Sequence, residues 1–274
     1  MFISCSNRKH SWDNFTLIIP AVSVGNVGQL AADLIVNTLD MERVGYILHP
    51  SLLPCVGNNP FAIGDGSSCQ LSTSCEIYES TKLKLVVIQQ RAPLIKGKSR
   101  AYTEWLSSWL NEIQFDQVVV LTSSFAYERL DQQLSGPPFR VLYTKKMEER
   151  SGEIFKSQIG WKELECRHSF PAPTPIQREN EHADNLFYMP GSGITKNLFE
   201  KCQELPVLVL MMFVSEGDNA QDAVDLVGQL NLWLKLVTQK DENAPSENVQ
   251  SCSWKVPDSW RLVFGSRFDQ KLFQ

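Results

Sequence analysis

Few residues of this sequence have the types and spacing that catalysis needs. Three of the four histidines, His10, His168 and His182, fall in segments predicted to be terminal or loop, where histidines are usually solvated. Neither a Gly-x-Ser-x-Gly elbow nor a His-Glu-x-x-His motif occurs. Glu216 and Asp218 could form a carboxylate pair, but Asp218 also suits a helix start, where it would accept free backbone N–H groups. The pattern predicts no catalytic residue and no enzyme.

The loop around Gly25 offers one alternative to a protein without catalysis. It follows an apolar run at residues 15–21 and precedes a helical pattern that begins at Val27. Because backbone N–H groups at a helix N-terminus attract anions, a phosphorylase or hydrolase could hold a small anionic substrate here. However, residues 25–28 lack the third glycine of the dinucleotide motif, no P-loop Lys-Ser/Thr pair follows, and no arginine is in obvious register. A close-packed turn between strand and helix is the simpler interpretation.

The cysteines indicate neither a metal site nor a disulfide framework. The seven cysteines, at positions 5, 55, 69, 75, 166, 202 and 252, form no Cys-x-x-Cys motif and no Cys/His cluster. Cys69 and Cys75 on one strand would lie about 20 Å apart, too far to bridge. We therefore expect no metal, no cofactor and reduced thiols, as in the cytosol or nucleus.

Composition and charge exclude other classes of function. Apolar side chains make up 43% of the 274 residues and charged ones 21%, as in an ordinary globular protein. The net charge of −5 argues against nucleic-acid binding, which needs a basic surface that displaces counterions. The longest apolar run, residues 205–214, is too short for a membrane span, which takes about 20 residues. Residues 8–10 only faintly resemble the start of a signal peptide, so neither nucleic acid nor a membrane is an expected partner.

The elements that would position any site are typical of an α/β fold. Residues 15–21 form the first predicted strand, and a helix with one apolar face follows. The apolar face consists of Val27, Leu30, Ala31, Leu34, Ile35 and Thr38, and the opposite polar side of Gln29, Asp33 and Asn37. A strand that leads directly into a helix is half of a βαβ unit, so parallel pairing is predicted.

Further segments complete this pattern. Apolar or alternating runs predict strands at residues 43–48, 71–77, 83–89, 118–121, 139–143 and 206–214. The short spacer at residues 79–82 predicts a hairpin, which makes the sheet mixed. Helices are predicted at residues 97–112, at residues 194–202, and after a capping box formed by Asp218 and Gln221.

The remaining segments are expected to be irregular. Residues 1–14 are polar and predicted to be loosely held. Residues 56–66 form a Gly/Asn/Pro loop that could contact a partner or only connect elements. Residues 122–124 suit a polar turn, and residues 167–184 a surface insertion. The apolar residues 254–264 must pack against another part of the chain.

Five segments, in order along the chain, resemble the proteasome assembly chaperone family. They are PAVSVGNVGQLAADL at 20–34, VGNNP at 56–60, PGSGITK at 190–196, FVSEGDN at 213–219 and SWRLVFGS at 259–266. The resemblance implies a non-catalytic chaperone with a nucleoside-phosphorylase-like fold, a three-layer α/β/α arrangement around a mixed, mainly parallel sheet. It also implies a heterodimer with proteasome assembly chaperone 1 that binds alpha-type proteasome subunits, promotes alpha-ring assembly of the core particle, prevents off-pathway alpha-ring dimers and is released on maturation. The cytoplasm and nucleus are the expected locations.

The last three residues, Leu272, Phe273 and Gln274, resemble the hydrophobic–tyrosine–any tail by which proteasome-binding factors insert between alpha-type subunits. Such a tail buries apolar area and pairs its carboxylate with a lysine, and full burial of Phe273 contributes about 1.5 to 3 kcal/mol. Phenylalanine in place of tyrosine loses a hydrogen bond of about 0.5 to 1.5 kcal/mol. We expect one α/β domain over residues 1–265, a flexible C-terminal tail over residues 266–274, and partner binding by these three residues.

Overall fold

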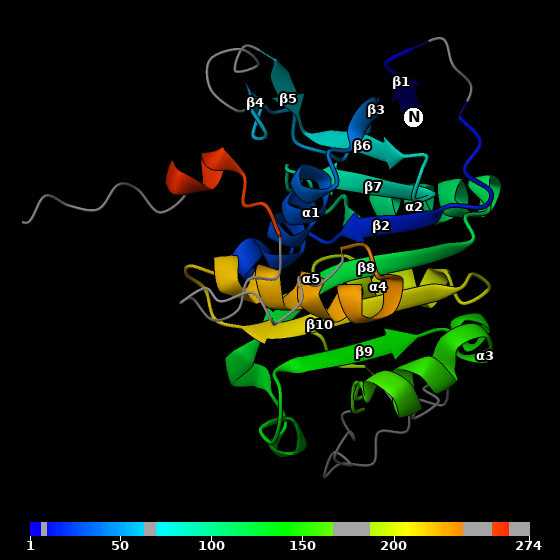
Figure 1. The fold of residues 1–274 in the computed structure, drawn as a ribbon, viewed down its shortest axis with the longest axis vertical. Helices are drawn as coiled ribbons and strands as arrows, with labels where there is room; N and C mark the ends of the chain where they lie inside the picture. The colour runs from blue at the N-terminus through cyan, green and yellow to red at the C-terminus, as the bar shows by residue number, and fades with distance from the viewer. Residues whose placement is uncertain (7–9, 63–69, 167–186, 238–253, 263–274) are drawn as a thin grey trace, which may run out of the picture.

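An eight-stranded mixed sheet organises the molecule (Figure 1). The computed structural model describes residues 1–6, 10–62, 70–166, 187–237 and 254–262. The sheet consists, in spatial order, of β1 (Phe2–Ser4), β3 (Glu42–Ile47), β6 (Cys75–Ser80), β7 (Leu85–Gln90), β2 (Thr16–Pro20), β8 (Gln117–Phe125), β10 (Val207–Val214) and β9 (Phe139–Tyr143). A separate ribbon pairs β4 (Val56–Asn58) with β5 (Leu71–Thr73).

The centre of the sheet is parallel and its flanks are antiparallel. β2 pairs in parallel with β7 and β8, and β8 pairs in parallel with β10. On one side β6, β3 and β1 continue the sheet with antiparallel pairs, and on the other side β9 runs antiparallel to β10. β6 and β7 form the hairpin predicted from the short spacer. The predicted mixed sheet with a parallel core is confirmed.

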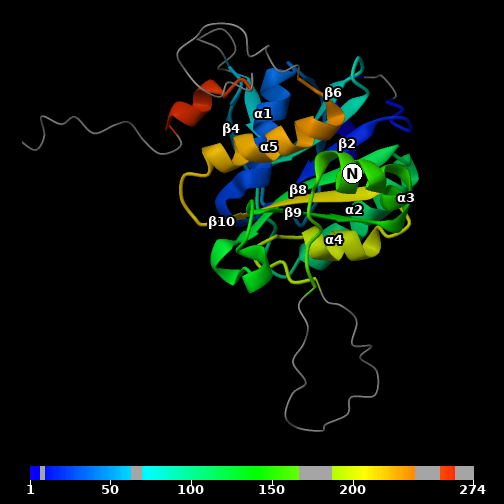
Figure 2. The same ribbon diagram turned by 60° about the horizontal axis from the view of Figure 1, so that its bottom comes forward.

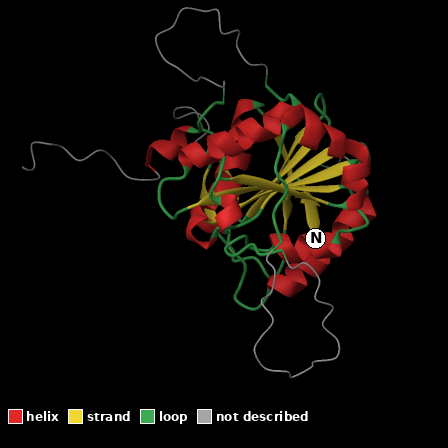
Figure 3. Ribbon diagram, turned by 90° about the horizontal axis from the view of Figure 1, so that it is seen from below, coloured by secondary structure: helices red, strands yellow, loops and turns green. Residues whose placement is uncertain are grey.

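Helices cover both faces of this sheet (Figures 2 and 3). The helices are α1 (Val27–Thr38), α2 (Ser99–Ile113), α3 (Lys145–Glu153), which a π turn (Ile154–Ile159) continues, α4 (Thr195–Lys201) and α5 (Ala220–Leu234). Short 3₁₀ turns occur at Val24–Asn26, Ala126–Glu128, Asp131–Gln133 and Asp258–Leu262. α1 and α5 pack side by side on one face together with α3, whereas α2 and α4 pack on the other. The predicted α/β/α layering is therefore confirmed.

Two hydrophobic cores result, one on each face of the sheet. In β2 the side chains of Leu17 and Ile19 enter the core under α2 and α4, and Ile18 enters the core under α1 and α5. Likewise, Val118 of β8 enters the core under α2 and α4, and Val119 enters the core under α1 and α5. Successive side chains of a strand point to opposite faces, so a strand that is covered on both faces needs a continuous apolar run.

The two ends of the sheet are finished differently. Beyond β9, the N–H of Val141 donates to the carbonyl of Lys162 over 3.0 Å, and the N–H of Leu164 donates to the carbonyl of Val141 over 2.8 Å. The segment 161–165 therefore covers this end. The opposite end is β1, which has only three residues.

The N-terminal segment is part of the sheet, contrary to the sequence prediction for residues 1–14. Phe2 pairs with Ile47 in the antiparallel β1–β3 pair. The Trp12 side chain is 3% exposed and lies in the core under α2. The buried Trp12 side chain anchors the described residues of this segment, although most of the segment's residues are polar.

Two strand predictions had the wrong limits. β8 does not end at residue 121 but continues through Thr122, Ser123 and Ser124, which are fully buried. The predicted strand at residues 71–77 is two strands, because β5 pairs with β4 in the separate ribbon whereas β6 pairs with β3 and β7 in the main sheet. In β5 the apolar Leu71 is exposed and its polar neighbour Ser72 is buried.

The C-terminal segment packs against α1 as far as the structure describes it. The side chain of Trp254 is 8% exposed and lies in the core under α1 and α5, as expected for the apolar residues 254–264. The predicted insertion at residues 167–184 and the predicted domain boundary after residue 265 lie outside the described residues.

Candidate functional site

The three residues predicted to bind a partner, Leu272, Phe273 and Gln274, lie outside the described residues, whose last range ends at residue 262. Their role stays a prediction. The other site considered from the sequence, the Gly25 loop, is fully described.

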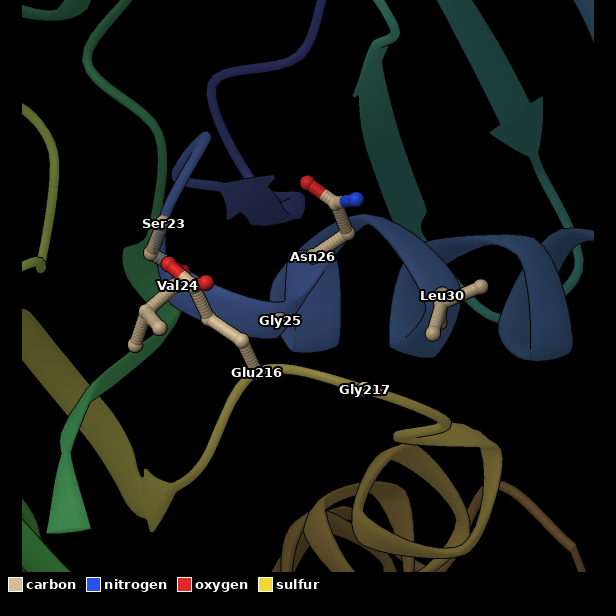
Figure 4. A pocket seen from close by; sticks show the side chains of 7 residues that line it. All are labelled: Ser23, Val24, Gly25, Asn26, Leu30, Glu216 and Gly217. Carbon is tan, nitrogen blue, oxygen red and sulfur yellow. The ribbon is translucent and has the colours of Figure 1, made fainter.

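The loop after β2 makes a tight turn around Gly25 (Figure 4). Gly25 has φ of +66°, and Asn26, which precedes α1, is also left-handed with φ of +54°. A Cβ on Gly25 would lie 2.5 Å from Asn219 Oδ1, so glycine is required here. The N–H groups of Val24 and Asn26, which could otherwise hold an anion, donate to backbone carbonyls. The close-packed turn that the sequence favoured is confirmed.

The hydroxyl groups near this turn are also used within the protein. Ser23 Oγ lies 2.7 Å from Ser123 Oγ and accepts the N–H of Ser123. Ser123 Oγ in turn donates to the carbonyl of Val24. These hydrogen bonds fix the loop to β8, and none of the partners that the structure records for the two hydroxyls is a basic side chain.

A pocket of about 510 Å³ opens beside the turn, between the loops that follow β2 and β10. It is lined by Ser23, Val24, Gly25, Asn26, Leu30, Glu216 and Gly217. Figure 4 shows the carboxylate of Glu216 reaching toward Ser23 and Val24. Among the described lining residues Glu216 is the only ionisable one, and its negative charge repels an anion. These residues therefore do not supply the cationic group that the alternative enzyme would need.

The loop beyond Glu216 differs in detail from the predicted capping box. The residue that precedes α5 is Asn219, and Asp218 Oδ1 accepts the N–H of Ala220, the first residue of the helix. Gln221 does not return to the start of the helix, because its side chain donates to Asp225. The carboxylate of Asp218 thus has the stabilising role at the helix start that the sequence suggested, without the reciprocal contact.

The side chain of His10 is 4% exposed, so this histidine is not solvated as the sequence predicted. Its Nδ1 lies 3.0 Å from Glu79 Oε2, and its Nε2 lies 3.3 Å from Ser4 Oγ, in the order of a hydrolytic triad. However, Ser4 Oγ also accepts a local backbone N–H. Burial alone would raise the pKa of Glu79, but hydrogen bonds from Trp12 and His10 lower this pKa below its ordinary value. The cluster ties the N-terminal segment to β6, with Ser4 Oγ in contact with both His10 and the N–H of Ser6.

Burial also shifts the pKa values of other titratable side chains. His49 packs against Tyr102 and Trp105, and burial lowers its pKa. Burial raises the pKa of the Cys202 thiol to about 11 and that of Cys75 further, so both stay protonated at neutral pH. Within the ranges that the structure describes, no three His, Cys, Asp or Glu side chains are grouped to hold a metal ion.

None of the helices in the described part of the chain is long and apolar enough to cross a bilayer.

The Gly25 turn, the helices that cover the sheet and the strands from β3 onward lie within one region of recognisable sequence. Residues 17–239 match the profile of the PAC2 family. This match covers most of the chain, so the chain belongs to the PAC2 family.

Relatives within this family are similar over the whole chain. Proteasome assembly chaperone 2 of Danio rerio and that of Homo sapiens are each 42% identical over 275 aligned residues, which cover 100% of this chain and 100% of the relative. Proteasome assembly chaperone 2 of Nematostella vectensis is 43% identical over 248 residues, 88% of this chain and 98% of the relative.

Solved structures share the fold at low sequence identity. PbaA of Pyrococcus furiosus, described as an archaeal homolog of proteasome-assembly chaperone, has a TM-score of 0.55 and 17% identity, and the match covers 83% of this chain and 84% of PbaA. PbaB of the same organism, described as an archaeal proteasome activator, also has a TM-score of 0.55, with 15% identity over 87% of this chain and 90% of PbaB. At these identities the likeness supports the fold alone.

Proposed function

We propose that this chain is a non-catalytic assembly chaperone of the proteasome. The observation that carries this proposal is the 42% identity, over the full length of both chains, to relatives named proteasome assembly chaperone 2. The Gly25 pocket agrees with it, because its lining carries a carboxylate where the alternative enzyme would need a cationic group.

In the proposed mechanism the chain acts as a heterodimer with proteasome assembly chaperone 1, in the cytoplasm and nucleus. The heterodimer binds alpha-type subunits, promotes formation of the alpha ring of the core particle, prevents off-pathway alpha-ring dimers, and leaves as the particle matures. No covalent bond is made or broken. The binding energy comes from surface complementarity and from insertion of Leu272, Phe273 and Gln274 between alpha-type subunits.

Exposed apolar side chains support a partner of this kind. Met1 and Leu48, which are 70% and 65% exposed, exchange backbone hydrogen bonds where β1 meets β3. Val56 and Leu71, which are 67% and 57% exposed, lie on the β4–β5 ribbon at the same end of the molecule in Figure 1. Exposed apolar side chains of this size are typical of positions that another protein can cover.

The test is capture of alpha-type subunits by the chain co-expressed with proteasome assembly chaperone 1, with and without Leu272–Gln274. We expect capture by the full-length chain and clearly weaker capture after truncation. Undiminished capture would rule out the tail as the binding element and leave the globular surface. If neither form captures an alpha-type subunit, the chaperone proposal is wrong, and binding of nucleosides and phosphate at the Gly25 pocket would be measured next.

A further inference from the structure

Two arginines share a single carboxylate where the loop after β8 meets β9. Arg140, on β9, is fully buried, and its Nε lies 3.0 Å from both carboxylate oxygens of Glu165. Arg129, on the loop, donates from Nη2 to the carbonyl of Gln133 and forms no ion pair with a described residue. We refer to Arg129, Gln133, Arg140 and Glu165 as the arginine cluster, which carries one more positive than negative charge.

The two guanidinium groups lie over neighbouring side chains on one face of the sheet. Arg140 is opposite Met211 in the β9–β10 pair, and opposed residues of an antiparallel pair point to the same face. Met211 and Phe213 of β10 both enter the core under α2 and α4, so they share this face. The Arg129 guanidinium lies over the ring of Phe213, 5.5 Å from its centroid. The two arginines therefore approach the same part of the sheet from the loop and from β9.

Gln133 connects the two arginines. Its carbonyl accepts from Arg129, and its side-chain amide donates over 2.9 Å to Glu165, the carboxylate that Arg140 binds. Burial alone would raise the pKa of Glu165, but hydrogen bonds from Arg140 and Gln133 lower this pKa below its ordinary value. Glu165 is therefore ionised at neutral pH, and its one negative charge already serves Arg140.

Each guanidinium group has a buried nitrogen without a hydrogen-bond partner. These nitrogens are Nε of Arg129 and Nη2 of Arg140. The remaining nitrogen of Arg140, Nη1, donates to the carbonyls of Pro137 and Phe139. Arginine stays protonated in proteins, and a buried donor without an acceptor is costly. A negatively charged acceptor would satisfy these donors and the excess positive charge together.

We infer that the arginine cluster binds a small oxyanion, a carboxylate or a phosphate, between Nε of Arg129 and Nη2 of Arg140. Planar guanidinium groups present N–H donors in a geometry that matches the oxygens of these anions. The side chain of Glu165 is 24% exposed, so the cluster is open to solvent on one side, and the full burial of Arg140 restricts the ligand to a small ion.

The position of the cluster in the fold agrees with this inference. Arg129 follows the carboxyl end of β8, and Phe213 is the residue before the carboxyl end of β10. In open α/β sheets, ligands bind at the carboxyl ends of parallel strands. A bound oxyanion would also tie the loop at residues 126–138 to β9. The site is separate from the Gly25 pocket and does not depend on the proposed chaperone function.

The test follows the side-chain N–H signals of the arginines by NMR in the full chain. Sodium phosphate and sodium acetate are titrated separately, with sodium chloride keeping the ionic strength constant. We expect the Nε–H signal of Arg129 and the Nη2–H signal of Arg140 to shift and to reach saturation. The anion that saturates at the lower concentration identifies the class of ligand.

A variant and a matched control test the role of the guanidinium. Arg129→Met keeps an unbranched apolar stem over Phe213, removes the donor, and assigns the Arg129 signal by its disappearance. The affinity read from the Arg140 signal should fall about tenfold to hundredfold, as expected for the loss of a hydrogen bond to a charged group. Arg100→Met is the control, because the Arg100 side chain is 86% exposed and pairs with Glu104 on its own helix. It should bind the anion as the unaltered chain does.

Three results would overturn the inference. They are the absence of saturation with both anions, an equal response to sodium chloride alone, and an unchanged affinity in Arg129→Met. Each would indicate that water satisfies the two donors. None of them affects the capture of alpha-type subunits, so the proposed function is tested independently.

Discussion

Arg91 and Asp33 form a two-pronged ion pair under the outer side of α1. Arg91 Nη2 lies 2.7 Å from Asp33 Oδ1, and Nη1 lies 3.1 Å from Oδ2. Gln89 Nε2 also donates to Asp33 Oδ1 over 2.7 Å. The sequence pattern put Asp33 on the polar, outward side of its helix, whereas the residue is 6% exposed. The helix is therefore held to β7 by charge as well as by its apolar face.

Replacing Asp33 with alanine should destabilise the fold strongly, because Arg91 would keep a largely buried charge without its partner. The expected loss in the free energy of unfolding is about 3 kcal/mol, measured by urea denaturation. The double change Asp33→Leu/Arg91→Met should cost less, since it removes both charges. Glu112→Gln, on the exposed side of α2, removes a charge without burial and is the control. A loss below about 0.5 kcal/mol for Asp33→Ala would contradict this account.

Two glycines in helices should respond oppositely to alanine. A Cβ on Gly28 would lie 2.4 Å from the carbonyl oxygen of Leu121, where α1 crosses β8 and the backbone cannot yield easily. Gly28→Ala should therefore lower the melting temperature. A Cβ on Gly228 in α5 would have no atom within 4 Å. Gly228→Ala should therefore stabilise the protein by about 0.5 to 1 kcal/mol through helix propensity. Calorimetry of the two variants tests the pair, and equal shifts would disprove the close approach of α1 to β8.

The lowered pKa of Glu79 predicts how acid weakens the N-terminal attachment. A carboxylate whose pKa is lower in the folded state than in the unfolded state stabilises the fold at pH values above its ordinary pKa of 4.5. This stabilisation is lost as the pH falls through the lowered pKa of the folded state. The stability difference between the unaltered chain and Glu79→Gln should therefore be largest at neutral pH and shrink in acid. Urea denaturation at pH 7 and pH 4 measures it.

The titratable group that faces this carboxylate is His10, so the same experiment is repeated in His10→Ala. The acid-dependent difference should persist there in reduced form, because Trp12 Nε1 and Thr81 Oγ1 still donate to Glu79. A stability difference that does not change with pH would show that the Glu79 carboxylate is not stabilised by folding.

The C-terminal phenylalanine gives a prediction of increased binding. If Phe273 occupies the place of the tyrosine in a hydrophobic–tyrosine–any tail, Phe273→Tyr restores a hydroxyl donor. One added hydrogen bond of about 0.5 to 1.5 kcal/mol corresponds to roughly two- to tenfold tighter capture of alpha-type subunits. Phe273→Ala should weaken capture in the same assay. Equal affinities for all three side chains would exclude Phe273 from the contact.

The parts of the fold that depend on neighbours in sequence were predictable. Residues 16–38 were predicted as strand, turn and helix because each element shows its period locally and Gly25 marks the turn, whereas the close approach of Gly28 to β8 is seen only in the structure. The sequence of the Gly25 loop also shows that the loop carries no cationic side chain. The sequence of the loop could not show that Glu216, almost 200 residues later, completes the lining of the same pocket.

The errors have a common physical cause, which is burial by segments remote in sequence. Thr122 and Ser124 continue a strand because their hydroxyls donate to the carbonyls of Ser192 and Pro190. Asp33 is buried because β7 brings Arg91 beneath it. A polar residue considered by itself is predicted to be exposed, and only knowledge of its partner in the tertiary structure shows that it is buried. The hydrogen bonds from Asn37 and Thr38 to the backbone of Lys255 left no sequence signal either, whereas Trp12 in a polar N-terminal segment was a signal that could have been used.

The cover over β9 has a consequence for the behaviour of the protein at high concentration. An uncovered edge strand is a template to which the strand of another molecule can be added, and an eight-stranded sheet has two such edges. Here residues 161–165 occupy one of them, and β1 offers only three residues at the other. Growth of the sheet from copy to copy, the first step toward amyloid-like aggregates, is thus hindered at both ends by the fold itself, independently of net charge.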